Sequence, residues 1–153
     1  MNPLAASDPL GLVPCTLTQT GPNTYQSPGG LVYGPDPGNN PFPNRYDHVM
    51  NHTADIPNRP QHGVFNSTNG NDVVRTVDDA YARVQRGEAV SIVQPNGNTS
   101  HYVNMGQPVG YVGGVPGGQA GHPQVNYVQL VTRNGNEVIT AYPVSGIPSS
   151  VLG

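Results

Sequence analysis

The chain has 153 residues, a formal net charge of −3 and 10% charged residues, with 20 glycines and 17 prolines. This length suits one domain with a hydrophobic core, while the glycine and proline content predicts much loop or extended chain. The six basic residues are all arginine, and so few positive charges exclude broad capture of nucleic acid, which needs many phosphate contacts.

Cys15 is the only cysteine, which excludes an internal disulfide and a four-thiolate zinc site. The chain has no apolar run long enough for a membrane span and no signal-peptide pattern, so we expect it to be soluble and any export to use another route.

Residues 1–44 contain a proline or glycine every few positions, a spacing that prevents a sustained helical or strand period. We therefore predict a linker over this region, with at most a short strand or turn around the sequence GLVYG. The folded domain is expected to occupy residues 45–153.

Two helices are predicted after this linker. The first runs from residue 45 to about residue 55, because the segment lacks proline and glycine, Asn44 is an acceptable N-cap and Pro57 lies just beyond the end. The second begins at Asp72 and ends at Gly87, which suits the residue after a helix C-cap. Its apolar residues recur at helical spacing: Val73, Val77, Ala80, Tyr81 and Val84.

The remainder of the chain has the pattern of β-strands. The β-prone segments are EAVSIVQ, TSHYVNMG, PVGYVGG, QVNYVQLVT and EVITAYPV, with a glycine-rich loop at residues 113–122. Two turns, PNGN and RNGN, place Asn-Gly between such segments, which is a strong signal for a hairpin. The sequence therefore predicts an α+β fold, in which two N-terminal helices pack on an antiparallel sheet of about four strands, preceded by a Pro/Gly-rich extended segment.

Three of the five histidines, His48, His52 and His62, fall within fifteen positions. On the predicted helix His48 and His52 are four residues apart, so they share one face with β-carbons about 5 to 6 Å apart. Zinc binding is one interpretation, although there is no HExxH motif and the third ligand would have to be His62, Asp55 or His122. The ordinary interpretation is that one histidine is solvated and another is half-buried with its hydrogen bonds satisfied.

General acid and base chemistry on RNA is a further interpretation of these histidines. Cleavage by transesterification needs a base for the ribose 2′-OH, an acid for the departing 5′ oxygen and a donor for the charge on the phosphorane. Imidazoles suit the first two roles because they titrate near neutral pH. Without lysine, the third role falls to Arg75 or to the hydroxyls of Thr140 and Tyr142. No such role is expected for His101, in a predicted strand, or for His122, in the glycine-rich loop.

The final predicted strand, VITAYPV, places Thr140 and Tyr142 on the same face by the period of two. Val138 is expected to share this face, and Ile139 and Ala141 are expected to face the other way. A strand with hydroxyls along one face either faces solvent or forms the floor of a site.

The sequence NPLAASDPLGL at residues 2–12 resembles the junction at the end of the Rhs/YD-repeat shell of bacterial polymorphic toxins. The resemblance rests on Pro3, Asp8, Pro9, Gly11 and Leu12. In that family the shell cuts itself after the last leucine of the motif, which implies a released toxin that begins here at residue 13. The resemblance therefore divides the chain into a junction at 1–12, a linker at 13–44 and a toxin domain at 45–153.

A second resemblance covers about residues 46–146. The histidine-bearing helix, HGVF, DDAYARV and the closing VITAYPV are similar to the barnase/EndoU/colicin/RelE-like ribonuclease superfamily, and in particular to contact-dependent toxins that end in TAYP. It implies a metal-independent ribonuclease without a cofactor. In this chain it implies His48 or His52 together with His62 as acid and base, with Thr140 and Tyr142 lining the phosphate site.

Together the resemblances imply a secreted antibacterial toxin that is delivered by the Rhs shell and a secretion apparatus into the cytoplasm of a target bacterium. They further imply an RNA substrate, with tRNA as the first expectation, and a cognate immunity protein that protects the producing cell.

Two other classes stay open at the level of sequence. One is an ADP-ribosyltransferase or NAD glycohydrolase toxin, which would depend on Glu88 or Glu137, the only glutamates. The other is a non-enzymatic binding module or adhesin tail that uses the loop at residues 113–122 as a contact surface. Deaminase chemistry is excluded because the HxE and PCxxC motifs are missing.

Overall fold

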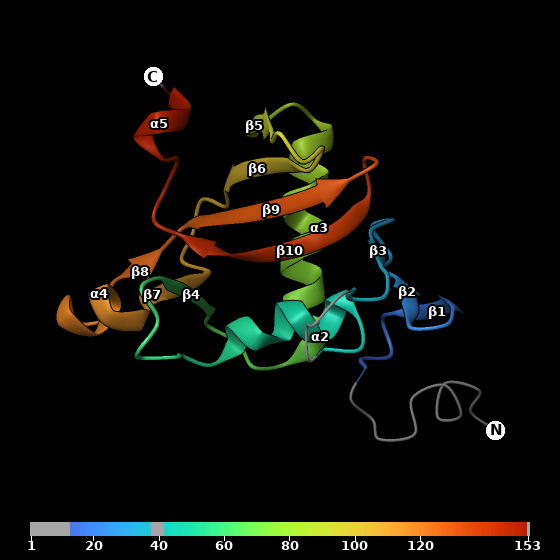
Figure 1. Cartoon of the computed structure of the whole chain (residues 1–153), viewed down its shortest axis with the longest axis horizontal. Helices are drawn as coiled ribbons and strands as arrows, with labels where there is room; N and C mark the ends of the chain where they lie inside the picture. The colour runs from blue at the N-terminus through green and yellow to red at the C-terminus, as the bar shows by residue number, and fades with distance from the viewer. Residues whose placement is uncertain (1–12, 38–41, 153) are drawn as a thin grey trace.

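Within residues 13–37 and 42–152, which this computed structural model describes, the strands form one sheet of seven and one of three (Figure 1). The order in the larger sheet is β1-β2-β3-β10-β9-β6-β5, and in the smaller sheet it is β4-β7-β8. The strands are β1 (Thr18–Gly21), β2 (Thr24–Gln26), β3 (Val32–Tyr33), β4 (His62–Phe65), β5 (Val90–Val93), β6 (Thr99–Asn104), β7 (Gly110–Gly113), β8 (Gln124–Val125), β9 (Tyr127–Arg133) and β10 (Glu137–Val144). The helices are α2 (Arg45–Met50), the 3-10 turn η1 (Asn51–Thr53), α3 (Gly70–Gln85), α4 (Gly114–Gln119) and α5 (Ser149–Leu152).

The predicted α+β class is confirmed, but the predicted arrangement is wrong in two respects. The main sheet has seven strands instead of about four, and it is mixed because β3 pairs with β10 in parallel. The helices are also not an N-terminal pair on one face, since α3 crosses behind the sheet while α2 lies along its β10 side (Figure 1). The junction motif at residues 1–12 lies outside the described residues.

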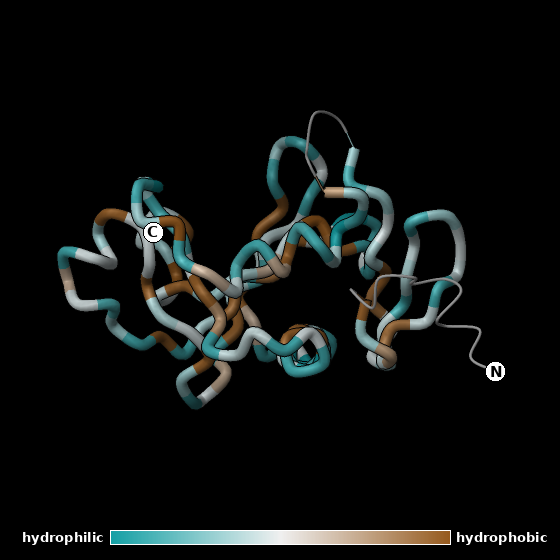
Figure 2. Tube along the Cα trace, turned by 90° about the horizontal axis from the view of Figure 1, so that it is seen from below, coloured by the Kyte–Doolittle hydropathy of each residue, from teal (hydrophilic) through white to brown (hydrophobic). Residues whose placement is uncertain are grey.

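The core lies between α3 and one face of the main sheet. The helix buries a stripe formed by Val73, Val74, Val77 and Ala80, at the 3.6-residue period of an amphipathic helix. Facing it are the fully buried Val103, Val128 and Leu130 from the central strands. Figure 2 looks nearly along α3 and shows its hydrophobic side turned toward the sheet. No helix in the described part of the chain is both long and apolar enough to cross a bilayer.

The segment predicted as a linker is part of this core between residues 13 and 37. Its apolar side chains Leu17, Tyr25, Leu31 and Tyr33 are at most 6% exposed, and they pack in the main cluster. β1, β2 and β3 form an antiparallel ribbon that joins the sheet through the β3–β10 pair. The predicted short strand in GLVYG is β3. The prolines and glycines lie between strands of only two to four residues, too short to give a recognisable period.

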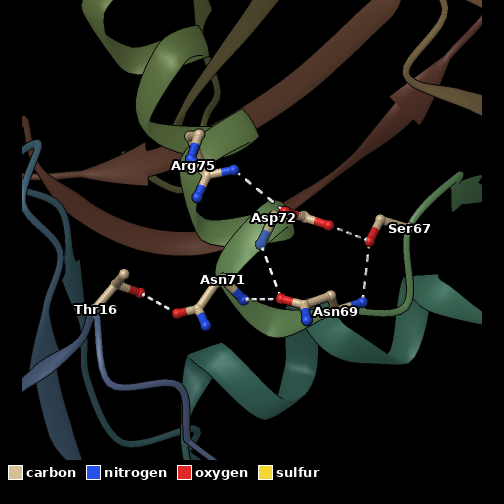
Figure 3. A network of polar contacts seen from close by, with 6 residues as sticks. All are labelled: Thr16, Ser67, Asn69, Asn71, Asp72 and Arg75. Atoms are coloured by element: carbon tan, nitrogen blue, oxygen red, sulfur yellow. Dashed lines mark hydrogen bonds and ion pairs between the residues drawn. The ribbon is translucent and has the colours of Figure 1, made fainter.

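The N-terminus of α3 is fixed by a network of polar side chains (Figure 3). Asn69 caps the helix by accepting from the backbone N–H groups of Asn71 and Asp72, and Ser67 donates to the Asp72 carboxylate at 2.8 Å. Thr16 donates to Asn71 at 2.8 Å and so connects the N-terminal segment to the helix. The helix starts at Gly70, two residues before the predicted Asp72, because Asn69 caps it.

The predicted end of α3 and the two predicted hairpins are confirmed. Gly87 has φ +76°, and the N–H groups of Gly87 and Glu88 donate to the carbonyls of Val84 and Arg83, which is the Schellman pattern. In the β9–β10 turn Asn134 and Gly135 both have positive φ, as a type I′ turn requires. The sequence PNGN joins β5 to β6 in the same antiparallel manner.

The smaller sheet contains the main differences in the C-terminal half. The segment QVNYVQLVT, predicted as one strand, is divided into β8 in the small sheet and β9 in the large one. The predicted glycine-rich loop at 113–122 contains the short helix α4. A side chain at Gly117 would collide with the carbonyl oxygen of Val112, so close packing of α4 on β7 accounts for a glycine at this position.

Candidate active site

The cleft that contains the predicted site residues has a volume of about 280 Å³ and lies where α2, η1, β4 and β10 meet. Five of the six predicted residues line it: His48, His52, His62, Thr140 and Tyr142. Arg59 and Gln61 complete its polar lining. Among the described residues no aspartate or glutamate lines this cleft, although the whole chain has a net charge of −3. The cleft therefore has the polarity expected for an anionic ligand.

Two of the histidines are positioned by α2 and the turn that follows it. The side chain of Asn44 accepts from the N–H of Asp47, which confirms the predicted N-cap. The regular helix ends at Met50, earlier than predicted, and His52 lies in η1 with φ −92° and ψ 21°. His48 and His52 nevertheless both line the cleft, as their four-residue spacing predicted.

His52 lies between two other rings. Its ring centroid is 4.6 Å from that of His62, with an interplanar angle of 23°, and 4.9 Å from that of Tyr142. His52 Nδ1 donates to the carbonyl oxygen of Gly63 at 2.9 Å, which leaves Nε2 as the nitrogen with the lone pair. Packing on both faces and a fixed proton position hold this imidazole in one orientation and tautomer.

The protonation of His52 is controlled mainly by its burial. Burial lowers the pKa of His52 from its ordinary value of 6.5 to about 4. The hydrogen bond to Gly63 opposes this shift, and the nearby positive charge of Arg59 adds to it. His52 is therefore a neutral imidazole at neutral pH and able to accept a proton.

His62 forms the inner layer of the stack. It is 2% exposed, and its Nε2 donates to the carbonyl oxygen of Ala54 at 2.9 Å. Within the described residues its Nδ1 and the hydroxyl of Thr140 are buried and have no hydrogen-bond partner. Buried polar groups in native proteins are rarely left without partners, so the floor of the cleft retains hydrogen-bonding capacity.

His48 is held by an aspartate from the segment that was predicted to be a linker. Its Nδ1 lies 2.9 Å from Oδ2 of Asp36, whose side chain is 1% exposed. The other carboxylate oxygen forms an ion pair with Arg45, whose Nη1 lies 3.0 Å away and donates a hydrogen bond to the carbonyl of Ile139 at 3.2 Å. Because a carboxylate only accepts, Nδ1 of His48 carries a proton. Asp36 and Arg45 are two functional candidates that the sequence did not indicate.

Thr140 and Tyr142 share one face of β10, as predicted, but Val138 does not. The pairing of β10 with β9 shifts register between Val138 and Thr140, which marks a bulge at Ile139. This extra residue reverses the alternation, so Val138 packs in the core together with Ala141. Burial raises the pKa of the Tyr142 phenol, with a further contribution from Tyr102, so Tyr142 stays a neutral donor.

Arg75 is the one predicted site residue that the structure does not bring to the cleft. It lies on the exposed side of α3, where its Nη1 is 3.2 Å from Oδ1 of Asp72 (Figure 3). The arginine that does line the cleft is Arg59, on the exposed loop between η1 and β4. Nothing in the sequence distinguished the two arginines, because their placement depends on how the loop and α3 pack.

The remaining histidines lie elsewhere. His101 is buried in the main sheet, with Ser91 Oγ 2.6 Å from its Nδ1 and Thr132 Oγ1 3.1 Å from its Nε2. His122 is exposed and packs edge-on against Tyr111. The zinc interpretation required His62, Asp55 or His122 to join His48 and His52. In the part of the chain that the structure describes, no group of three or more His, Cys, Asp or Glu is arranged to hold a metal ion.

Comparison of the chain with protein-family models, curated proteins and solved structures gave no match. The function is therefore inferred from the chemistry of the cleft.

Proposed function

We propose that the protein is a metal-independent endoribonuclease that cleaves RNA by transesterification in this cleft. The observation that carries the proposal is the cleft lining itself. Three imidazoles, each with a hydrogen bond that fixes one ring nitrogen, meet an arginine in a cleft lined by no described carboxylate. These are the groups that phosphodiester cleavage requires: an acid, a base and cationic or neutral donors.

The electrostatics of the cleft suit a phosphodiester. Arg59 supplies a permanent positive charge at the rim, and Tyr142 stays protonated as a hydrogen-bond donor. A phosphate beside His52 would place a negative charge near a ring that burial keeps neutral, and this charge favours the protonated form of the ring. The substrate itself thus assists proton transfer to His52 during the reaction.

The alternative NAD chemistry finds less support in the geometry. Glu88 is exposed and pairs with Arg86, and Glu137 is exposed at the start of β10. Neither glutamate lines the cleft. The adhesin alternative assigned a contact role to residues 113–122, whereas the polar groups described here gather in the cleft.

The biological setting follows from the resemblances in the sequence. We propose an antibacterial toxin that is released from an Rhs shell, acts on RNA in the cytoplasm of a target cell, with tRNA as the first candidate, and is neutralised by a cognate immunity protein. An immunity protein that covers the mouth of the cleft would exclude a macromolecular substrate.

The test is incubation of the purified chain with total bacterial RNA in excess EDTA, followed by analysis of fragment ends. We expect discrete fragments with 2′,3′-cyclic phosphate and 5′-hydroxyl ends, which the double variant His48→Ala/His62→Ala does not produce. Intact RNA, or cleavage that requires added metal, would refute the proposal. Depletion of NAD in the same sample would favour the alternative.

A further inference from the structure

We propose that His48 is the general acid of this reaction, positioned by Asp36, and that His52 is the general base. This assignment rests on the proposed ribonuclease function, and it divides the proton transfers between two particular nitrogen atoms. It also makes the N-terminal segment, through Asp36, a functional part of the catalytic site.

Asp36 is placed by backbone contacts that tie its segment to the start of α2. Pro35 forms a β-bridge with Asn44, and the N–H of Arg45 donates to the carbonyl of Gly34 at 2.8 Å. These contacts bring the carboxylate to the side of α2 that carries His48. With its side chain 1% exposed, Asp36 is shielded from water and contacts both Arg45 and His48.

This pairing determines which ring nitrogen of His48 can exchange a proton with a substrate. A carboxylate at Nδ1 holds that nitrogen protonated, so the proton that His48 exchanges with a substrate is on Nε2. The carboxylate also gives the imidazolium form a negative partner, as in other sites where an aspartate orients a histidine. Arg45 balances the remaining carboxylate charge, and the ring of Phe42 packs edge-on against His48 with centroids 5.6 Å apart. Such an anchored imidazole is suited to hold a proton and donate it.

His52 has the opposite environment. Its Nδ1 proton is given to a neutral carbonyl, its ring is enclosed by His62 and Tyr142, and no described carboxylate lines the cleft beside it. The lone pair on Nε2 is therefore the natural acceptor for a proton. Two histidines in one cleft thus differ in the partner of Nδ1, and that difference separates donor from acceptor.

Two proton transfers accompany cleavage of the phosphodiester bond. His52 Nε2 takes the proton of the ribose 2′-OH while the 2′ oxygen attacks phosphorus. The bond between phosphorus and the 5′ oxygen breaks, and His48 Nε2 delivers its proton to that oxygen. The products are a 2′,3′-cyclic phosphate and a 5′-hydroxyl, with His52 charged and His48 neutral.

The leaving group provides the test, because a thiolate is a far weaker base than an alkoxide and departs without protonation. The probe is an RNA oligonucleotide containing the linkage mapped in the EDTA experiment, made with either oxygen or sulfur as the bridging 5′ atom. For each variant the ratio of the two cleavage rates is measured. This ratio does not depend on the fraction of folded enzyme, since unfolding lowers both rates equally.

We expect His48→Ala to cleave the oxygen substrate at least about 10²-fold more slowly, and the sulfur substrate within a fewfold of the unsubstituted protein. Asp36→Asn should show the same pattern with a smaller loss, because the amide can still accept from His48 but lacks the negative charge that faces His48 and Arg45. His52→Ala should lose activity on both substrates alike. The matched control is Asp55→Asn, which removes a carboxylate whose one hydrogen-bond donor among the described residues is the Gly114 N–H, and its ratio should not change.

Should Asp36→Asn fold poorly, the double variant Asp36→Asn/Arg45→Gln removes both charges together. It should show the same change in the ratio of the two cleavage rates as Asp36→Asn. Equal losses on the two substrates for His48→Ala would overturn its assignment as the acid, and an unchanged ratio in both Asp36 variants would overturn the positioning role. Failure of the unsubstituted protein to cleave either RNA would instead refute the ribonuclease proposal.

Discussion

The buried histidines of the cleft differ from the buried histidine of the main sheet in the partners of their ring nitrogens. His101, in the main sheet, has a hydroxyl oxygen within hydrogen-bonding distance of each ring nitrogen, from Ser91 and Thr132. In the cleft, His52 and His62 each use one nitrogen on a backbone carbonyl. Burial lowers the pKa of His52 and of His101 alike, so burial by itself does not mark a reactive group. What distinguishes the cleft is that His52 Nε2 and His62 Nδ1 are not used in these hydrogen bonds to backbone carbonyls. Arg59 also lines the cleft, and no carboxylate among the described residues does.

The largest difference should be seen in catalysis. His52→Asn keeps an amide N–H near the position of Nδ1, so it can still donate to Gly63, but it removes Nε2. We expect kcat/KM on RNA to fall by roughly 10³-fold, within the range for loss of a general base. The matched variant His101→Gln should change kcat/KM by less than about twofold once corrected for the folded fraction. Similar losses in the two variants would contradict the separation of the two groups.

The next largest effect is the pH dependence of stability. The pKa of His52 is about 4 in the folded protein and near 6.5 when unfolded, so the unfolded state binds the proton more readily between these values. This contribution is complete above about pH 6.5 and is lost as pH falls toward 4, by an order of magnitude of about 3 kcal/mol.

Urea unfolding at pH 7, 5 and 4 measures this loss. The free energy of unfolding should depend less steeply on pH in His52→Asn than in the unsubstituted protein. Part of the slope will remain, because burial also lowers the pKa of His101. An identical slope in the variant would show that His52 is not the titrating group.

Arg59 and Arg75 carry the same charge, but Arg59 lines the cleft and Arg75 does not. Arg59→Ala should lower kcat/KM about 10²-fold, because it removes a cation from the cleft in which the proposed reaction develops phosphorane charge. Arg75→Ala removes an equal charge from the exposed side of α3 and should leave kcat/KM unchanged. Steady-state kinetics on the same oligonucleotide measure both, and equal effects would show that general charge, and not position, controls the rate.

The smallest effect should come from the partners of His101. Thr132→Val keeps the shape of a side chain that is 1% exposed but removes the hydroxyl beside Nε2. We expect the free energy of unfolding to fall by about 1–2 kcal/mol, with no change in cleavage by the folded protein. Thermal unfolding and kinetics on one sample provide the comparison, and a loss of specific activity would give His101 a role that we have not assigned.

Local signals in the sequence predicted the parts of the fold that depend on near neighbours. Asn44, Gly87 and the two Asn-Gly turns act within a few residues, and each was placed correctly. A short strand is predicted at β3, but β1 and β2 are not predicted, because strands of four and three residues are too short to show a period. The ribbon that they form with β3 joins the main sheet only through the pairing of β3 with β10, more than a hundred residues away.

The same division applies to the site. The histidine spacing and the closing strand brought together five of the six predicted residues. Arg59 and Asp36 were missed because neither belongs to a periodic element, and their positions arise only from tertiary packing. The bulge at Ile139, which moves Val138 into the core, likewise leaves no mark in an alternating sequence.

The parallel pairing of β3 with β10 has a consequence for the synthesis of the chain. Val32 is aligned with Glu137, so the early strand that precedes Asp36 cannot take its place in the sheet until the chain through Glu137, more than a hundred residues later, has left the ribosome. Thr140 and Tyr142 are made later still. A nascent chain therefore lacks a complete cleft until β10 has been made, so the chemistry proposed for the cleft can begin only after that strand has emerged.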